Sequence, residues 1–221
     1  LVRGTLLADG TPAAPILFTT VQDDTGPDFV LGSGDDLDSG GDGATQGTRG
    51  QWYGIQFDAT STSNLLDHVE VRFTGYGSKG AIIVAGGEVT LTNSVLRESS
   101  SNGVRIQQSN PVLTDNTYRD NSGPAISMDL SSDPTISGVT VENNAWNGLT
   151  MDAGTLSGDS RWDDPDIVYR IPVHSSSGIT VPEGATLTIA PGQVIKGIDT
   201  YSTLDVAGSL IADGTEADPI T

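Results

Sequence analysis

The chain has 221 residues, with 29 Asp and Glu against 10 Lys and Arg, a formal net charge of −19 and an isoelectric point near 4.1. A surface this acidic repels phosphate backbones, which excludes nucleic acid as a partner. The lack of cysteine excludes disulfide scaffolds and thiolate zinc sites. No apolar run approaches the roughly 18 residues that a membrane span requires.

Short runs rich in β-branched residues recur along the chain, and glycine, proline, asparagine, aspartate or serine interrupts them every few residues. Apolar residues do not follow the helical spacing i, i+3, i+4, i+7, and the runs at 81–84 and 186–190 are typical of strands. The charge and the glycine content would also suit a disordered chain. The regular strand-like runs argue against disorder and predict an all-β protein.

Three segments in the middle of the chain align with one another: 88–97, 110–119 and 133–142. Their leading apolar residues, Leu91, Leu113 and Ile136, recur at a nearly constant step, and an earlier copy starts at Leu66. A second set of apolar residues keeps the same spacing: Leu96, Tyr118 and Val141. A period of about 22–25 residues with short strands predicts the coil of a parallel β-helix, in which each strand pairs with its equivalent one coil later.

Seven to nine such coils, at roughly 4.8 Å each, would form a rod of roughly 35–45 Å whose coils bury their apolar faces against one another. A sandwich or jelly roll is the alternative, although neither requires equivalent residues at a constant step. We expect residues 1–221 to form a single module. An acidic loop insertion at about 23–48 and a second loop at about 152–166 would interrupt its coils.

A longer repeat links the two ends of the sequence. Residues 4–16 reappear as residues 208–220, offset by 204, with nine of 13 positions identical and two more similar. Two coils of one rod could share a turn motif by chance. The extent of the match favours one unit of a longer tandem or head-to-tail array, with copies of itself or adjacent repeats as end-to-end partners.

The segments 184–196 and 204–220 resemble the right-handed parallel β-helix repeats of large secreted bacterial surface proteins. Residues 15–24 and 50–57 continue the resemblance on either side of the acidic loop. It implies a pectin-lyase-like architecture, an extracellular or cell-surface location, and an adhesive or structural role. On this basis we expect no enzymatic activity, with a polysaccharide lyase as the alternative.

The acidic loop carries seven aspartates between positions 23 and 42, separated by glycines. Ca²⁺ takes 6–8 oxygen ligands from flexible loops of this kind. We therefore predict calcium binding here, by Asp23, Asp24, Asp35, Asp36, Asp38 and Asp42, with Asp28 nearby. A solvated acidic loop is the alternative. A second candidate cluster comprises Asp159, Asp163, Asp164 and Asp166, where an Arg–Asp surface network including Arg161 is the competing explanation.

Arginines recur at one position of consecutive coils: Arg72, Arg97 and Arg119. Polysaccharide lyases of this fold use an arginine as base, but acidic neighbours would also pair with an outward-facing arginine column: Glu70, Glu98, Asp120 and Glu142. We expect the pairing and no catalysis. His68 and His174 fall in different phases of the repeat and have no serine elbow or metal spacing near them.

Four aromatic residues remain: Trp52, Tyr53, Trp146 and Trp162. Aromatic rings can stack on sugars, but their places at strand entries and turns favour packing. The sequence thus predicts a calcium-stabilised, extracellular structural or adhesive β-helix that forms part of a fibre, stalk or surface filament. A polysaccharide-binding or lyase-like β-helix with extracellular glycans as ligands is the alternative.

Overall fold

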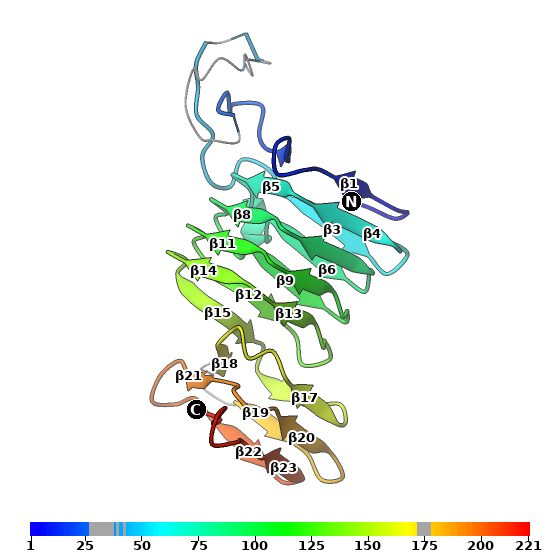
Figure 1. The fold of residues 1–221 in the computed structure, drawn as a ribbon, viewed down its shortest axis with the longest axis vertical. Helices are drawn as coiled ribbons and strands as arrows, with labels where there is room; N and C mark the ends of the chain where they lie inside the picture. Colours follow the sequence, from blue (N-terminus) through cyan, green and yellow to red (C-terminus); the bar gives the residue numbers. More distant parts are fainter. Residues whose placement is uncertain (27–37, 39, 42, 172–177) are drawn as a thin grey trace.

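A computed structural model describes residues 1–26, 38, 40–41, 43–171 and 178–221 of the chain. Its strands coil into a solenoid with the two termini at opposite ends, and every pairing between named strands in the described residues is parallel (Figure 1). One 3-10 turn, Tyr76–Ser78, is the sole helical element of this part. It contains no helix long and apolar enough to cross a membrane.

Three sheets form the sides of the solenoid. Sheet 1 consists of β1 (Leu7–Asp9), β4 (Asn64–Asp67), β7 (Val89–Thr92), β10 (Val112–Thr114) and β13 (Thr135–Ser137). Sheet 2 consists of β2 (Ile16–Phe18), β5 (Val69–Arg72), β8 (Val95–Arg97), β11 (Thr117–Arg119) and β14 (Thr140–Glu142). Sheet 3 runs along nearly the whole stack and consists of β3 (Ile55–Asp58), β6 (Ile82–Ala85), β9 (Val104–Gln107), β12 (Pro124–Met128), β15 (Trp146–Met151), β18 (Tyr169–Ile171) and β21 (Ile195–Gly197).

Sheets 1 and 2 end at β13 and β14, and two further sheets accompany sheet 3 beyond that point. Sheet 4 consists of β16 (Gly154–Thr155), β19 (Ile179–Val181) and β22 (Leu204–Val206). Sheet 5 consists of β17 (Ser160–Trp162), β20 (Thr186–Ile189) and β23 (Ser209–Ala212). The segment expected as a second loop at 152–166 therefore contains two short strands.

The register of the strands follows the repeat in the sequence. Leu113 lies opposite Leu91 on one side and Ile136 on the other, and all three are at most 3 % exposed. The neighbouring set behaves in the same way, with Leu96, Tyr118 and Val141 in register on sheet 2. The predicted all-β parallel solenoid is confirmed, and its coil of roughly 23 residues lies in the range of solenoid repeats.

The apolar core is one continuous column, because each coil stacks its inward side chains on those of the next. Its largest fully buried members come from all parts of the stack and include Phe57, Leu66, Leu91, Ile106, Tyr118 and Trp162. Burial of one such side chain contributes about 1.5–3 kcal/mol, so a coil owes its stability to its neighbours.

The corners between strands use left-handed backbone conformations that recur with the same step. The first series separates sheet 1 from sheet 2: His68, Asn93, Asp115 and Gly138. The second follows sheet 2: Phe73, Glu98, Asp120 and Asn143. Asparagine and aspartate tolerate this region best after glycine, whereas His68, Phe73 and Glu98 adopt it at a cost that the surrounding pairing must offset.

Buried asparagines satisfy the backbone at these corners. The amide oxygen of Asn116 accepts a hydrogen bond from the Ser94 backbone N–H (3.0 Å), and its nitrogen donates to the Leu91 carbonyl (2.8 Å). Asn121 repeats the arrangement with Ser99 and Leu96. These amides tie each coil to the one before it and leave the corner backbone satisfied.

Asp67 makes a further connection between coils and generates a test at acid pH. Its carboxylate accepts hydrogen bonds from Asn93 Nδ2 (2.8 Å) and Thr92 Oγ1 (2.7 Å), which lower its pKa from 3.8 to about 2. The folded state thus favours the ionised form. This contribution to stability is present above the unfolded value of 3.8 and is lost as the pH falls through about 2.

We expect Asp67→Asn to lower the free energy of unfolding at neutral pH and to flatten its decline in acid, measured by urea denaturation across this pH range. Asp9→Asn, on the exposed register partner, is the control and should leave the acid limb unchanged. An Asp67→Asn profile parallel to that of the native chain would contradict the assignment.

Candidate functional site

The acidic insertion begins where β2 ends, and its first leg, residues 19–26, folds against the outer face of β5. Asp23 is fully buried there, and its carboxylate accepts a hydrogen bond from Arg72 Nε at 2.6 Å. The hydroxyls of Thr19 and Thr25 also donate to it. Asp23 therefore anchors the insertion to the solenoid through a buried ion pair.

Arg72 is the centre of a buried charge network. Its Nη1 donates to Glu70 Oε1 (3.0 Å) and to the Gly26 carbonyl (3.1 Å), and its Nη2 donates to Thr25 Oγ1 (2.7 Å). Glu70 also accepts from Arg97 Nε at 2.7 Å, one coil further on. Arg72 and Arg97 thus lie opposite each other in register, and the carboxylates of Asp23 and Glu70 neutralise their buried guanidinium groups. Burial lowers the pKa of Arg97, although the negative charge of Glu70 opposes this shift.

The arginine column departs from the expectation in one respect. Arg72, Arg97 and Arg119 flank the inward residues of sheet 2 as predicted, but Arg72 and Arg97 are buried. The insertion covers Arg72 on the outer face of the sheet. Arg119 is half-buried and pairs with Asp120 at 2.7 Å. Charge pairing within the column is confirmed, and the two buried arginines are out of reach of a polymeric substrate.

The insertion returns alongside its first leg. Asp24 Oδ2 accepts hydrogen bonds from the Thr45 backbone N–H (2.6 Å) and hydroxyl (2.7 Å). Asp24 is 6 % exposed, and its Oδ1 is buried without a hydrogen-bond partner. Further along, Arg49 Nε donates to Glu98 at 2.7 Å. Asp24 thus holds the two legs together and retains one unsatisfied carboxylate oxygen.

The structure describes one further aspartate of the insertion. Asp38 accepts a hydrogen bond from the Gly43 backbone N–H at 3.1 Å. Four others lie outside the described residues: Asp28, Asp35, Asp36 and Asp42. The predicted convergence of these carboxylates on a calcium ion stays a prediction.

The second aspartate cluster does not converge on one point. Asp159 accepts from the Thr186 backbone N–H (2.8 Å), and Asp163 pairs with Arg161 (2.5 Å) on the surface. The other two members bind sheet 1, because Asp164 Oδ1 accepts from the Ile136 backbone N–H (2.7 Å) and Asp166 Oδ2 from that of Gly138 (2.7 Å). These last two side chains occupy the edge of β13, where no further strand pairs among the described residues.

Burial sets Asp164 apart from its neighbours. It is 3 % exposed, and its Oδ2 accepts a 2.6 Å hydrogen bond from the Tyr169 hydroxyl. Burial raises its pKa, and the negative charges of Asp163 and Asp133 act in the same direction. Within the described part of the chain, no three acidic or histidine side chains are grouped to hold a metal ion.

The outer face of sheet 3 carries a feature that the sequence did not single out. A cavity of about 400 Å³ opens there, lined by polar side chains that include Gln56, Lys79, Asn102, Arg105, Gln107 and Asp152. Arg105 faces Asp152 through both of its terminal nitrogens, with Nη1 at 2.8 Å from Oδ1. The lining therefore offers amide groups, one ion pair and a lysine to a polar ligand.

Cations gather on this face of an otherwise acidic protein. One outward register position of sheet 3 holds Gln56, Ile83, Arg105, Ser127, Thr150, Arg170 and Lys196. With Lys79, four of the ten Lys and Arg residues lie along it. Strand register would have revealed this row, but the repeat in the sequence is too irregular beyond residue 150 to set that register.

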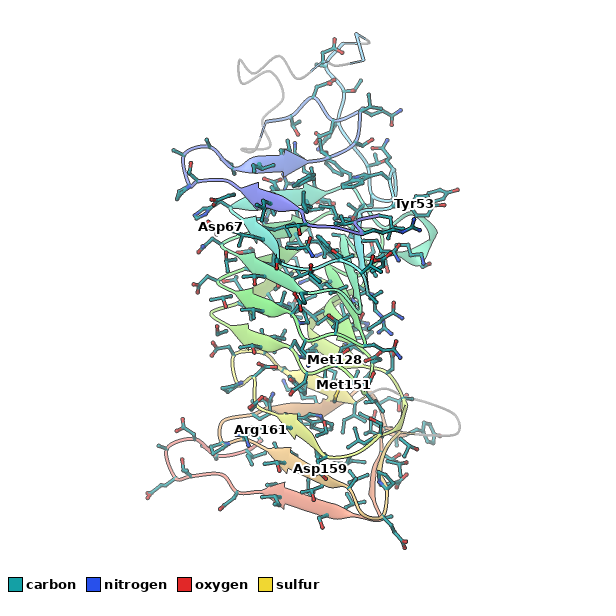
Figure 2. The ribbon with its side chains drawn as sticks, turned by 90° about the vertical axis from the view of Figure 1, so that its right-hand side faces the viewer. Tyr53, Asp67, Met128, Met151, Asp159 and Arg161 are labelled. Atoms are coloured by element: carbon teal, nitrogen blue, oxygen red, sulfur yellow. The ribbon has the colours of Figure 1, made fainter. Side chains whose placement is uncertain are left out.

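The aromatic residues divide into packed and exposed ones. Trp162 is buried beside Tyr169, and Trp52 donates from Nε1 to the Arg72 carbonyl at 2.8 Å, so packing is confirmed for both tryptophans. Tyr53 is 60 % exposed and projects from the side of the stack, in edge contact with Tyr76 (Figure 2). The expectation of packing is wrong for Tyr53, whose strand-entry position at Gly54 turns the ring outward.

Three further candidates from the sequence are Trp146, His68 and His174. Trp146 is 46 % exposed, and Arg170 lies over its ring at 3.9 Å, so it covers the surface of sheet 3 and is not part of the core. His68 Nδ1 contacts Asp67 at 2.8 Å and has no nucleophile beside it in the described contacts. His174 lies outside the described residues.

A family model for the right-handed β-helix region matches residues 50–164, a little more than half of the chain. The chain belongs to the right-handed β-helix family. No curated protein and no solved structure matches it. Right-handed β-helices include polysaccharide-cleaving enzymes and non-enzymes, so family membership fixes the architecture and leaves the activity to be argued from the site.

The buried network gives a test of how the insertion is fastened. Arg72→Met would leave Asp23 buried without its counter-charge and Glu70 paired with Arg97 alone, and we expect a loss of about 3–5 kcal/mol in the free energy of unfolding. The matched control is Arg3→Met, which removes an exposed pair with Asp58 (3.2 Å) and should leave the free energy of unfolding nearly unchanged. Equal effects of the two substitutions in urea denaturation would show that the network does not carry this stability.

Proposed function

We propose that this right-handed β-helix is an extracellular structural or adhesive module, one unit of a stalk, fibre or surface filament. The observation that carries the proposal is the repeat between residues 4–16 and 208–220. Each copy places a strand, β1 or β23, before the same turn. Two segments 204 residues apart that share sequence and local structure suit units that repeat along an array.

Two hydrogen bonds of the first turn recur in the second. The Thr11 N–H donates to the Ala14 carbonyl (3.1 Å), and the Ala14 N–H donates to Thr11 Oγ1 (3.1 Å). Residues 204 positions later do the same, with Thr215 to Asp218 at 3.1 Å and back at 2.9 Å. The shared motif thus encodes a turn, which supports its reuse at the start of a following unit.

A fusion of two copies tests the array. Joining residue 205 of one copy to Val2 of the next replaces one copy of the motif by the other. We expect small-angle scattering to report a single straight rod about twice the length of the monomer, because stacked coils continue through the joint. The control carries a flexible Gly/Ser linker at the same point. Scattering curves that match in the two fusions would contradict a continuous rod.

We further propose that the insertion binds calcium and that Asp24 is a ligand. Asp23 is saturated by Arg72 and two hydroxyls, whereas Asp24 Oδ1 is a buried carboxylate oxygen without a partner. An unsatisfied buried acceptor costs about 1–3 kcal/mol, which a cation would offset. The acidic residues at 28–42 are candidates for the other ligands. The second aspartate cluster is already engaged by donors, and we assign no calcium there.

Calcium removal tests this assignment. A ligand that binds only the folded state stabilises it by about 2.7 kcal/mol at a hundredfold excess over Kd, so millimolar calcium should raise Tm and EGTA should reverse the rise. Asp24→Asn should abolish the response. The control is Asp205→Asn, on an exposed residue of β22. A native Tm that is identical in calcium and in EGTA would contradict calcium binding.

The cavity on sheet 3 favours a second candidate function, the binding of an extracellular glycan. Its amides, its lysine and the Arg105–Asp152 pair suit hydroxyl and carboxylate groups, and Arg72 and Arg97 are too buried to serve as a lyase base. On a glycan array we expect binding that Arg105→Ala removes and that Arg161→Ala, on a surface pair outside the cavity, retains. If unsaturated sugars are released, as monitored by their ultraviolet absorbance, the protein is instead a lyase.

A further inference from the structure

The solenoid has a seam between β15 and β18, where two of its three sides are interrupted. Sheets 1 and 2 end at β13 and β14, and sheets 4 and 5 begin with β16 and β17 (Figure 1). Sheet 3 alone crosses the seam in the described residues, through the register pairs Leu149–Tyr169 and Thr150–Arg170. We call the coils from β1 to β15 the N-terminal stack and those from β16 to β23 the C-terminal stack.

Side chains replace strand pairing at the seam. Asp164 and Asp166 accept hydrogen bonds from Ile136 and Gly138 of the N-terminal stack, at 2.7 Å each. Asp164 also accepts from the Tyr169 hydroxyl of the C-terminal stack, and is buried between the two. Two carboxylates thus close the edge of β13 where a strand would otherwise pair, and the contact has fewer hydrogen bonds than a strand ladder supplies.

The seam also holds polar groups that remain unsatisfied. Arg170 Nη1 and Thr150 Oγ1, on paired residues of β18 and β15, are buried without a hydrogen-bond partner. The guanidinium lies over the Trp146 ring, and a Cβ on Gly148 would come within 2.7 Å of the Val168 carbonyl. Each of these two groups weakens the contact, because no hydrogen bond compensates for the loss of its hydration. On the N-terminal side, Met128 and Met151 lie opposite each other in register, although the pairing of β12 with β15 shifts its register between Pro124 and Ile126 (Figure 2).

The sequence changes character at the same place. The match to the right-handed β-helix model ends at residue 164, and the nearly constant step of the central repeat ends with Ile136. The motif shared by residues 4–16 and 208–220 lies outside this central region. The seam is therefore the meeting point of two kinds of coil.

We propose that the two stacks are separate cooperative units and that the seam is the joint at which the rod opens first. The C-terminal stack then opens as a whole while the N-terminal stack stays folded. A rod built from such units would yield at defined joints under heat, denaturant or force. The proposal does not depend on calcium, on glycans or on array formation.

Native-state hydrogen exchange of the whole chain, followed by mass spectrometry at increasing denaturant, tests the joint. We expect the amides of β19, β20 and β23 to share one opening and to exchange at least about tenfold faster than those of β6, β7 and β8, with a step at the seam. A single opening for both stacks would overturn the proposal. Protection against exchange that increases gradually from β23 through β17 to β14, without a step, would overturn it too, because such a gradient indicates fraying from one end.

Substitution of Asp164, the buried aspartate at the seam, makes the test more specific. Asp164→Ala removes the bonds to Ile136 and Tyr169, and we expect exchange in the C-terminal stack to quicken about tenfold with the N-terminal stack unchanged. The matched control, Asp163→Ala, removes the adjacent carboxylate, which pairs with Arg161 at the surface. Equal acceleration of both stacks by Asp164→Ala would show that they are one unit. The profile of the native chain decides the question if this variant does not fold.

Discussion

Register between successive coils is the constraint on which this structure depends. A single coil cannot bury its own apolar face, so Leu91 is buried only because Leu66 and Leu113 lie directly above and below it. The left-handed corners at recurrent positions keep the length of each side constant, and the corner asparagines satisfy the backbone that the turn exposes. Every other feature, including the insertion and the cavity, is placed by this repeated step.

In this chain of net charge −19, many of the few basic residues lie at two places on the solenoid. Two of the ten basic residues, Arg72 and Arg97, are buried on the outer face of sheet 2, where Asp23 and Glu70 neutralise them. Four others line the outer face of sheet 3. Much of the remaining surface is left acidic, which is consistent with the calcium binding that we propose for the insertion. These basic residues thus fasten the insertion to the solenoid and line the outer face of sheet 3, where the polar cavity lies.

The nearly constant step between equivalent residues was sufficient to predict the parallel solenoid, the inward ladder at Leu91, Leu113 and Ile136, and the pairing of the arginine column. The burial of Arg72 could not be predicted, because it depends on residues 19–26 folding back over β5, a contact between segments 49 residues apart. The role of Asp164 could not be predicted either, since an aspartate beside an arginine and a tryptophan looks like a surface cluster until the edge of β13 is known. The contact between Tyr53 and Tyr76 could not be predicted, because the two rings come from different turns of the chain.

A distance along the outer face of sheet 3 tests the central claim most directly. The chain has no cysteine, so paired cysteines can carry spin labels at Gln56 and Lys196, six register steps apart, and at Arg105 and Lys196, four steps apart. A constant step of about 4.8 Å predicts backbone separations of about 29 Å and about 19 Å, in the ratio of three to two. Distances measured by pulsed electron spin resonance that do not scale with the number of coils would contradict a single ladder running the length of the rod.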